Sequence, residues 1–304
     1  MSNLQRPAFV YMNGRLTPWD DARIHVSSEA LIRGISVFEG IKGYWSADAK
    51  TFSLLNLHDH YVRLCQSALM VHLPFQSDYA GFERACITLV ESLLVPGKDL
   101  WLRPTLFALE GSWGLDTVTD LTITAYSQEM TRPQPLVAGI STWQRPSDAS
   151  QPARIKSAAN YLVSRNARID GRRHGYGEMV LLNPAGRVAE GTGSAILIVR
   201  NGQVITPPAS EGCLESITVK ITERICSVLG TPFVVRPIDK TELYIADEIC
   251  FAGTLLELAQ VKQMEFRTIA VPGPVIQPIT DAFWRAVRCE QSIPGINLTP
   301  AYTV

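Results

Sequence analysis

A polar stretch with two prolines, residues 127–135, divides this 304-residue chain into two parts. The part before it carries helical apolar spacing at 54–73 and 79–94, strand-like composition at 101–107 and 121–126, and an Asn13-Gly14 hairpin turn. The length is about twice that of a typical domain of ~150 residues. We therefore predict a first domain over 1–126, a linker over 127–135 and a second domain over 136–304.

The second part mixes the two kinds of element. Helices are predicted at 158–174 and 216–229, strands at 137–143, 178–182, 195–199 and 233–235, and turns at 183–186 and 201–202. This order lacks the regular strand–helix–strand alternation of a doubly wound sheet. The order of elements therefore argues against a doubly wound α/β fold.

Composition excludes several functional classes. Lys and Arg total 28 against 29 Asp and Glu, so there is no basic excess to bind a nucleic-acid backbone. No apolar run approaches the ~20 residues of a membrane span, and the first residues lack the apolar core of a secretory signal. Six cysteines are scattered without a CxxC pair, which argues against a zinc site or a disulfide scaffold. We expect a cytoplasmic protein without a metal, a nucleic-acid partner or a membrane partner.

Two residues are candidates for chemistry on their own surroundings. Lys156 lies among small and apolar residues just before a predicted helix, and burial there would favour the neutral amine, the nucleophile of Schiff-base chemistry. A lysine in such a setting can also be a surface residue with a buried stem. Glu190 stands beside the glycines Gly191 and Gly193, and a buried carboxylate there would need a cation. Neither residue decides the function alone.

Eight motifs in a fixed order resemble those of branched-chain amino acid aminotransferases, which are fold type IV pyridoxal-phosphate enzymes. They are Val37–Gly40, His58–Leu64, Leu102–Pro104, Lys156–Tyr161, Arg173–Tyr176, Glu190–Gly191, Leu214–Thr218 and Gly253–Glu257. The resemblance covers about residues 8–285. It implies a D-amino acid aminotransferase-like fold, with a small α+β domain beside a larger pseudo-barrel domain that binds pyridoxal 5'-phosphate.

The resemblance also implies roles for the cofactor-binding residues. Lys156 matches the Schiff-base lysine, which moves a proton between substrate and cofactor. Glu190 matches the carboxylate that pairs with the pyridine nitrogen, and Tyr161 the phenol that hydrogen-bonds the cofactor O3′. The matching phosphate ligands are Arg63, Ile217, Thr218 and Thr254.

The substrate pocket departs from the family pattern. Trp101 replaces an aromatic hydroxyl two residues before Arg103, which can still bind a carboxylate. Arg33 replaces a tyrosine that, in the family, reaches the partner subunit's pocket. There Arg33 would favour a second carboxylate or bind the α-carboxylate from another side, or it would form a salt bridge with a neighbouring acid. The resemblance also places Phe38, Leu115 and Leu255 in this pocket, and the bulk of Leu255 tightens a turn that usually carries alanines.

These changes leave the substrate open. The leading prediction is a transaminase that moves an amino group between an amino acid and a 2-oxo acid by a ping-pong mechanism. A D-amino acid or (R)-amine transaminase is the alternative favoured by Arg33, and an aminodeoxychorismate lyase-type activity is a third. Because the partner's Arg33 and Leu115 would complete each site, the minimal unit expected is a homodimer, and higher homo-oligomers stay open.

Overall fold

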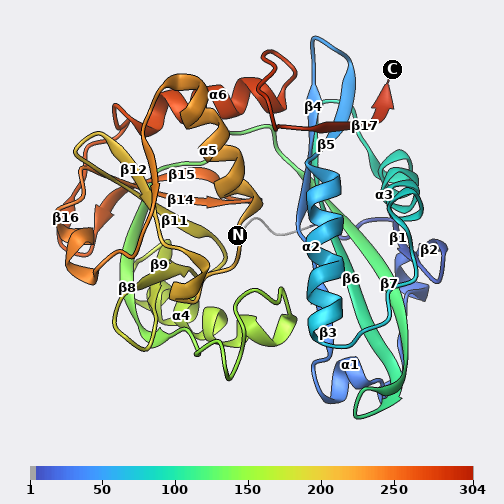
Figure 1. Ribbon diagram of the computed structural model, residues 1–304. Helices are drawn as coiled ribbons and strands as arrows, with labels where there is room; N and C mark the ends of the chain where they lie inside the picture. The colour runs from blue at the N-terminus through green and yellow to red at the C-terminus, as the bar shows by residue number, and fades with distance from the viewer. Residues whose placement is uncertain (1–4, 304) are drawn as a thin grey trace.

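The computed structural model describes residues 5–303, and this part of the chain forms two β-sheets that lie side by side (Figure 1). The first sheet has the strand order β17-β5-β4-β6-β7-β1-β2, with β3 paired to β6. Its strands are β1 (Phe9–Met12), β2 (Arg15–Pro18), β3 (Ser36–Phe38), β4 (Ile41–Ser46), β5 (Thr51–Leu55), β6 (Asp99–Ser112), β7 (Leu115–Gln128) and β17 (Leu298–Thr303).

Helices α2 (Leu57–Met70) and α3 (Tyr79–Leu93) pack on this sheet, and the short α1 (Glu29–Ile32) lies near its end. Both long helices form where the apolar spacing predicts them. The Asp78 side chain caps α3 by accepting from the Gly81 N–H at 2.8 Å. Asn13, at φ 52°, and Gly14 turn the chain between β1 and β2 as expected.

The second sheet has the order β10-β9-β8-β15-β14-β11-β12-β13, with β16 paired to β15. Its strands are β8 (Leu136–Gln144), β9 (Glu178–Leu182), β10 (Val188–Gly191), β11 (Ala195–Arg200), β12 (Gln203–Thr206), β13 (Phe233–Val235), β14 (Glu248–Gly253), β15 (Glu257–Met264) and β16 (Arg267–Thr268). Helices α4 (Tyr161–Arg173), α5 (Ile217–Leu229) and α6 (Ile276–Val287) accompany it. The pairs β8–β9 and β8–β15 are parallel while β14–β15 is antiparallel, so the sheet is mixed. The α+β class predicted from the sequence is confirmed.

The two parts share a core. Tyr44 and Leu55 of the first sheet are buried in the same apolar cluster as residues of α5 and α6. The end of the chain crosses back, because β17 pairs with β5 although the expected boundary had placed 298–303 with the second part. Strand β7 runs on to Gln128, into the expected linker. Long-range pairing of this kind leaves no local signal in the sequence.

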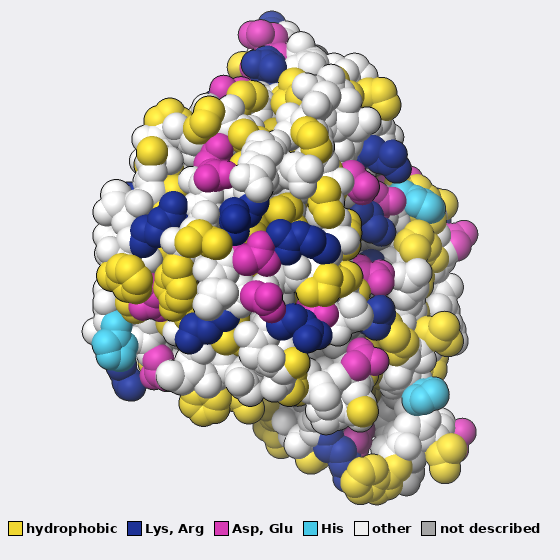
Figure 2. Space-filling view, turned by 60° about the vertical axis from the view of Figure 1, so that its left-hand side comes forward, with side chains coloured by type: hydrophobic (Ala, Val, Ile, Leu, Met, Phe, Trp, Pro, Cys, Tyr) yellow, Lys and Arg dark blue, Asp and Glu magenta, His cyan; other side chains and the backbone are white. Residues whose placement is uncertain are grey.

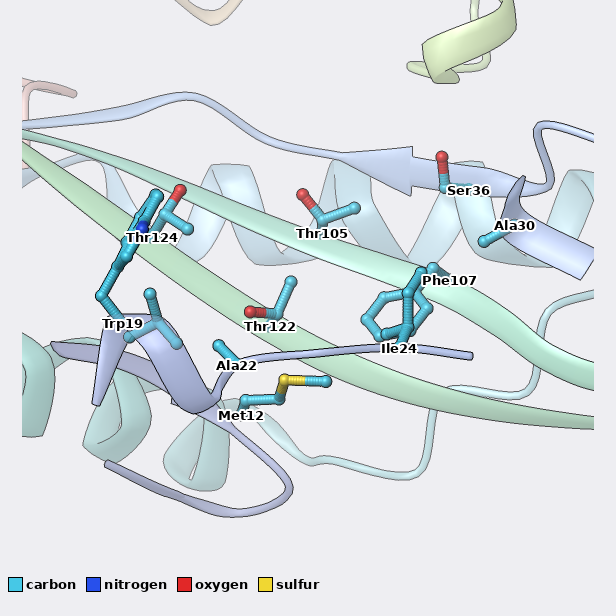
Figure 3. A pocket seen from close by; sticks show the side chains of 11 residues that line it. Met12, Trp19, Ala22, Ile24, Ala30, Ser36, Thr105, Phe107, Thr122 and Thr124 are labelled. Atoms are coloured by element: carbon cyan, nitrogen blue, oxygen red, sulfur yellow. The ribbon is translucent and has the colours of Figure 1, made fainter. Parts of the chain in front are cut away.

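Two surface features bear on partners. A cavity of about 410 Å³ lies on the face of β6 and β7 that turns towards β1 and α1, with Trp19 at one end and Ile24 and Phe107 at the other (Figure 3). On the face shown in Figure 2, acidic and basic side chains are interspersed without a patch of one sign. Among the helices of residues 5–303, none combines the length and apolar character needed to cross a bilayer.

Candidate active site

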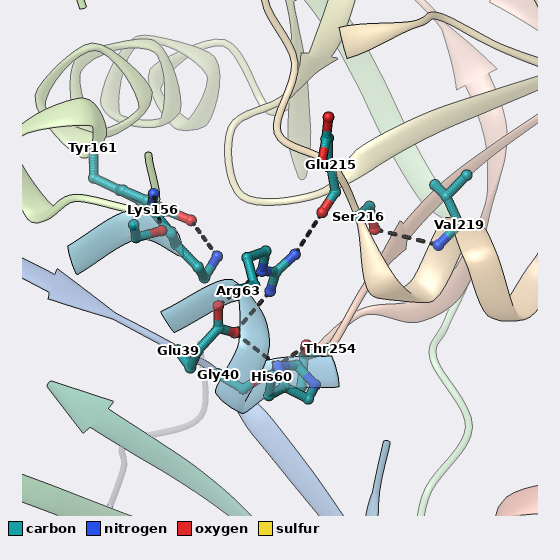
Figure 4. A network of polar contacts seen from close by, with 11 residues as sticks. Glu39, Gly40, His60, Arg63, Lys156, Tyr161, Glu215, Ser216, Val219 and Thr254 are labelled. Carbon is teal, nitrogen blue, oxygen red and sulfur yellow. Dashed lines mark hydrogen bonds and ion pairs between the residues drawn. The ribbon is translucent and has the colours of Figure 1, made fainter. Parts of the chain in front are cut away.

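The backbone of Lys156 is fixed by the first part of the chain. Its carbonyl oxygen accepts from the Phe38 N–H at 2.9 Å, and its own N–H donates to Ser67 Oγ in α2 at 3.1 Å. Its side chain turns to the start of α4, where Nζ donates to the Tyr161 hydroxyl at 3.0 Å (Figure 4). The half-buried amine is thus held at the junction of the two parts.

Aromatic and cationic groups surround this amine. The Phe38 ring lies 5.0 Å from the Tyr161 ring and 5.1 Å from Lys156 Nζ. The Arg103 guanidinium stacks on the Phe38 ring, with its central carbon 4.1 Å from the ring centroid. Burial lowers the pKa of Arg103, and no carboxylate among residues 5–303 forms an ion pair with it. A partly desolvated cation of this kind is suited to bind an anionic group.

Glu190 ends up as a buried carboxylate on β10. Its Oε1 lies 3.3 Å from Arg145 Nε, and its Oε2 accepts from the Leu214 N–H at 3.0 Å. Burial raises the pKa of Glu190, and the charges of Arg145 and Lys156 offset only part of this rise. The carboxylate therefore favours the approach of a further cation.

Arg63 links α2 to the loop before α5. Its Nε and Nη2 donate to the two Glu39 oxygens at 2.8 and 2.7 Å, and its Nη1 donates to the Glu215 carbonyl at 2.7 Å (Figure 4). Burial alone would raise the pKa of Glu39, but Arg63 and a hydrogen bond with His60 outweigh it and hold that pKa far below the ordinary range. Burial also lowers the pKa of His60, which favours its neutral form, and His60 Nδ1 is hydrogen-bonded to the Glu39 carboxylate at 2.7 Å.

The loop beside Arg63 leads into the start of α5, a potential anion site. The Ser216 side chain caps α5 by accepting from the Val219 N–H at 3.3 Å. The first N–H groups of the helix, at Ile217 and Thr218, have no partner within the helix itself. Thr254, from the turn between β14 and β15, donates its hydroxyl to the Gly40 carbonyl at 3.0 Å.

The expected substrate-side residues are only partly brought to this centre. Trp101 is buried and stacks on Tyr126 with ring centroids 5.7 Å apart. Its indole also occupies the space that a side chain at Gly40 would need, since a Cβ there would lie 3.1 Å from Nε1. Leu255 is half exposed on its turn.

Arg33 and Leu115 lie apart from the centre, at the exposed ends of α1 and the β6–β7 hairpin. Arg33 forms an ion pair with Glu29 and stacks on Trp113 at 4.9 Å. Within one chain, the charge of Arg33 is therefore paired locally with Glu29, which is the salt bridge expected as one of its roles.

Three residues of this centre escaped the sequence analysis. Arg145 was not singled out from the sequence, yet it is buried beside Glu190. Glu39 and His60 lay inside recognised motifs without assigned roles, and they orient Arg63. One signal in the sequence could have suggested this cluster. Glu39 is followed later in the chain by His60 and Arg63, which lie three residues apart.

The donor set fits a phosphorylated, cationic ring cofactor. Glu190 is a buried carboxylate whose raised pKa would return towards its ordinary range beside a protonated ring nitrogen. The Lys156 amine can form a covalent bond to an aldehyde carbon. Arg63 and the start of α5 present N–H groups suited to a phosphate.

Comparison with known proteins identifies the family. The sequence profile described as "Amino-transferase class IV" matches residues 36–264, which is most of the chain. The chain belongs to the class IV aminotransferase family. It is thus an aminotransferase, and the resemblance drawn from its motifs is confirmed.

The relatives share nearly the whole length. A probable branched-chain-amino-acid aminotransferase from Aquifex aeolicus is 30% identical, with 97% of each chain covered. The structure of a branched-chain aminotransferase from Thermoproteus uzoniensis with norvaline has a TM-score of 0.90 at 31% identity, covering 98% of this chain and 100% of that one. The PLP-form from Thermobaculum terrenum has a TM-score of 0.88 at 31% identity, covering 98% and 99%. These structures confirm the two-domain fold type IV architecture.

Proposed function

We propose that this aminotransferase uses pyridoxal 5'-phosphate to transfer an amino group between an amino acid and a 2-oxo acid, with Lys156 as its catalytic residue. One observation carries the proposal: the half-buried Lys156 amine, at the junction of the two parts, donates to the Tyr161 phenol at 3.0 Å. The PLP-form of the Thermobaculum terrenum relative supports the choice of cofactor.

The residues divide the work between binding and proton transfer. Pyridoxal phosphate, when bound, supplies an electron-withdrawing ring that stabilises negative charge at the substrate Cα. Lys156 Nζ would take the proton from the substrate Cα and deliver it to the cofactor carbon that bears the amino nitrogen, and the Tyr161 hydroxyl, 3.0 Å from Nζ, would orient that amine. Glu190, as a buried carboxylate, would keep the ring nitrogen of the cofactor protonated. The phosphate would be held by Arg63, Ile217, Thr218 and Thr254.

The substrate pocket combines apolar and cationic groups. Phe38, Trp101 and Leu255 would form its apolar walls, and Arg103, stacked on Phe38, offers a cation without a carboxylate partner among the described residues. The names of the relatives support branched-chain amino acids as substrates. Arg33, in place of a tyrosine, favours a D-amino acid or (R)-amine transaminase as the second candidate.

We infer that the active unit is a homodimer in the cytoplasm. Large apolar side chains are exposed around Arg33, with Trp113 84% and Leu115 71% exposed. The cavity in Figure 3 is lined by Ile24 and by Ala30 of α1, the helix directly before Arg33, so a second copy could cover both features. The cysteines of residues 5–303 are free thiols, which supports a reducing compartment.

We assign β17 to the smaller domain and keep the domain boundary near 129–135.

Absorption spectroscopy of the purified holoenzyme tests this function. L-leucine, L-glutamate, D-alanine and (R)-1-phenylethylamine are added separately, and the visible band of the bound cofactor is followed. Loss of the band with the L-amino acids supports a branched-chain-type enzyme, whereas loss only with D-alanine or the amine supports the second candidate. A protein that develops no band with added pyridoxal phosphate would contradict the proposal.

A further inference from the structure

A chain of four buried charges crosses between the two parts next to the candidate site. Lys42 Nζ, on β4, lies 2.5 Å from Glu257 Oε1 at the start of β15 and 3.9 Å from Asp99 Oδ2 at the start of β6. Asp99 in turn binds Arg288 with both oxygens, at 2.6 and 2.8 Å. Two cations thus balance two anions, and all four residues are at most 5% exposed. Burying such groups costs free energy that a contact of well-packed apolar residues would avoid.

The Glu257 end of this chain fixes a turn of the site. Glu257 directly follows the turn that carries Thr254 and Leu255, and Lys42 lies two residues after Gly40. The turn is therefore tied to one short segment at two points, by the bond from Thr254 Oγ1 to the Gly40 carbonyl at 3.0 Å and by the Lys42–Glu257 ion pair. Lys42 is also the cross-strand partner of Trp101, so the same lysine stands beside another wall of the substrate pocket.

Backbone geometry at the turn points the same way. Glu257 has a φ of 49°, in the left-handed region that residues other than glycine seldom adopt. Such a conformation persists where the surroundings over-determine it. On the opposite side the turn meets the loop after Glu190, since a Cβ on Gly253 would lie 3.2 Å from Ser194 Cβ. The turn is thus confined between the Glu190 loop and Gly40, with a side-chain ion pair at its end.

We propose that the Lys42–Glu257 ion pair is a positioning contact that sets the Gly253–Leu256 turn against Gly40 and so orients the groups that bind substrate and cofactor. Neither residue touches the reacting atoms. The inference rests on the proposed function for what the turn binds, but the fixing of the turn itself is independent of that function. Asp99 and Arg288 hold Lys42 in place from the other side.

The decisive variant is the double substitution Lys42→Met with Glu257→Gln, which removes the ion pair without leaving a lone buried charge. Its matched control is Arg236→Met with Glu242→Gln, which removes the 2.7 Å ion pair at the end of β13 in the same way, among residues not assigned to the site. Both proteins are studied by amide hydrogen exchange with mass spectrometry and by steady-state kinetics.

We expect amides of residues 253–258 to exchange about tenfold faster in the Lys42/Glu257 variant than in the wild type, with α3 unchanged. The KM for the amino donor should rise about tenfold while kcat stays within about twofold. The control variant should change neither quantity. Unchanged exchange at 253–258, or exchange that rises equally throughout the chain, would overturn the proposal.

A second variant serves if the double variant does not fold. Glu257→Asp keeps the charge and a residue type that tolerates the left-handed region, but it shortens the reach to Lys42 by one methylene. It should show the same local rise in exchange, and wild-type exchange would overturn the proposal. If the wild type itself neither binds pyridoxal phosphate nor transaminates, the proposed function fails, whereas the exchange result still decides the role of the ion pair.

Discussion

The surroundings of Lys156 and those of Arg33 differ in how far one chain completes them. Lys156 is held through its carbonyl, its N–H and its amine by Phe38, Ser67 and Tyr161. Arg33 is exposed, and it contacts a neighbouring glutamate and Trp113, whose ring is 84% exposed. The residues proposed to bind the cofactor are therefore preorganised within one chain, whereas the residues expected to set specificity are exposed in it, as the proposed homodimer would require.

The largest effect on activity is expected for Lys156, whose surroundings one chain completes. Lys156→Ala removes the proposed base and covalent attachment point, and we expect the rate of transamination to fall by about 10⁴-fold or more. Lys262→Ala, an exposed lysine on β15, is the matched control and should retain wild-type activity. The rates are measured with saturating amino donor and acceptor. Residual activity within tenfold of the wild type would remove Lys156 from the mechanism.

Glu190→Gln should lower kcat by about 10²–10³-fold, because a neutral amide cannot keep a proton on the facing ring nitrogen. The same substitution tests the electrostatics of the cofactor-free protein. Since burial raises the pKa of Glu190 in the folded state, wild-type stability is lost as pH rises through the carboxyl range, and Glu190→Gln does not share this loss.

The stability gained by the variant relative to the wild type should therefore grow from pH 4 to pH 7 in urea unfolding of the cofactor-free protein. A difference that is constant with pH would mean that Glu190 titrates normally. Arg145 belongs to the same comparison, because its charge already offsets part of the rise in pKa.

The pKa of Glu39 is shifted in the opposite direction to that of Glu190, so the pH dependence of its contribution to stability is also reversed. Its pKa in the folded protein is held below the ordinary value of 4.5, so its contribution to stability is present above that value and is lost as pH falls. Glu39→Gln should cost about 3 kcal/mol at pH 7, since it breaks the buried pair with Arg63. The cost should shrink by about 1.4 kcal/mol per pH unit below 4.5. Urea unfolding at pH 7 and pH 3.5 measures it, and an equal cost at both values would contradict the ion-pair account.

The smallest effect is expected for Arg33, whose surroundings are incomplete within one chain. Arg33→Tyr restores the residue usual for the family and should change the preference between L-leucine and D-alanine by about tenfold or less, because Arg33 acts from an exposed position. The ratio of kcat/KM values for the two substrates measures this. Glu29→Gln, which removes only the local ion pair, is the control. An identical effect of both substitutions would assign Arg33 a purely local role.

The comparison also explains what could be predicted from the sequence. The helix predicted over 79–94 is α3 at Tyr79–Leu93, and the strand over 178–182 is β9 with the same bounds, because both follow from local apolar patterns. Helix α6 was not predicted, since Pro278 interrupts its pattern, although a proline is tolerated in a first helical turn.

The contacts that build the site could not be predicted from the sequence, for a different reason. Glu39 lies 24 residues before Arg63 in the sequence, and Glu190 of β10 meets Arg145, which follows β8, so neither pairing leaves a local pattern. Motif resemblance supplied Lys156, Tyr161 and Glu190 as candidates, but it did not supply the residues that hold them. Those residues follow from packing, which couples positions far apart in the chain.

The most direct test of the central claim is to trap the bond between protein and cofactor. The holoenzyme is reduced with borohydride, digested and analysed by mass spectrometry. The account predicts a phosphopyridoxyl group on the peptide that contains Lys156, and none on peptides containing Lys42 or Lys262. A modification at another lysine, or none in a protein shown to bind the cofactor, would contradict the assignment of Lys156 and the chemistry that follows from it.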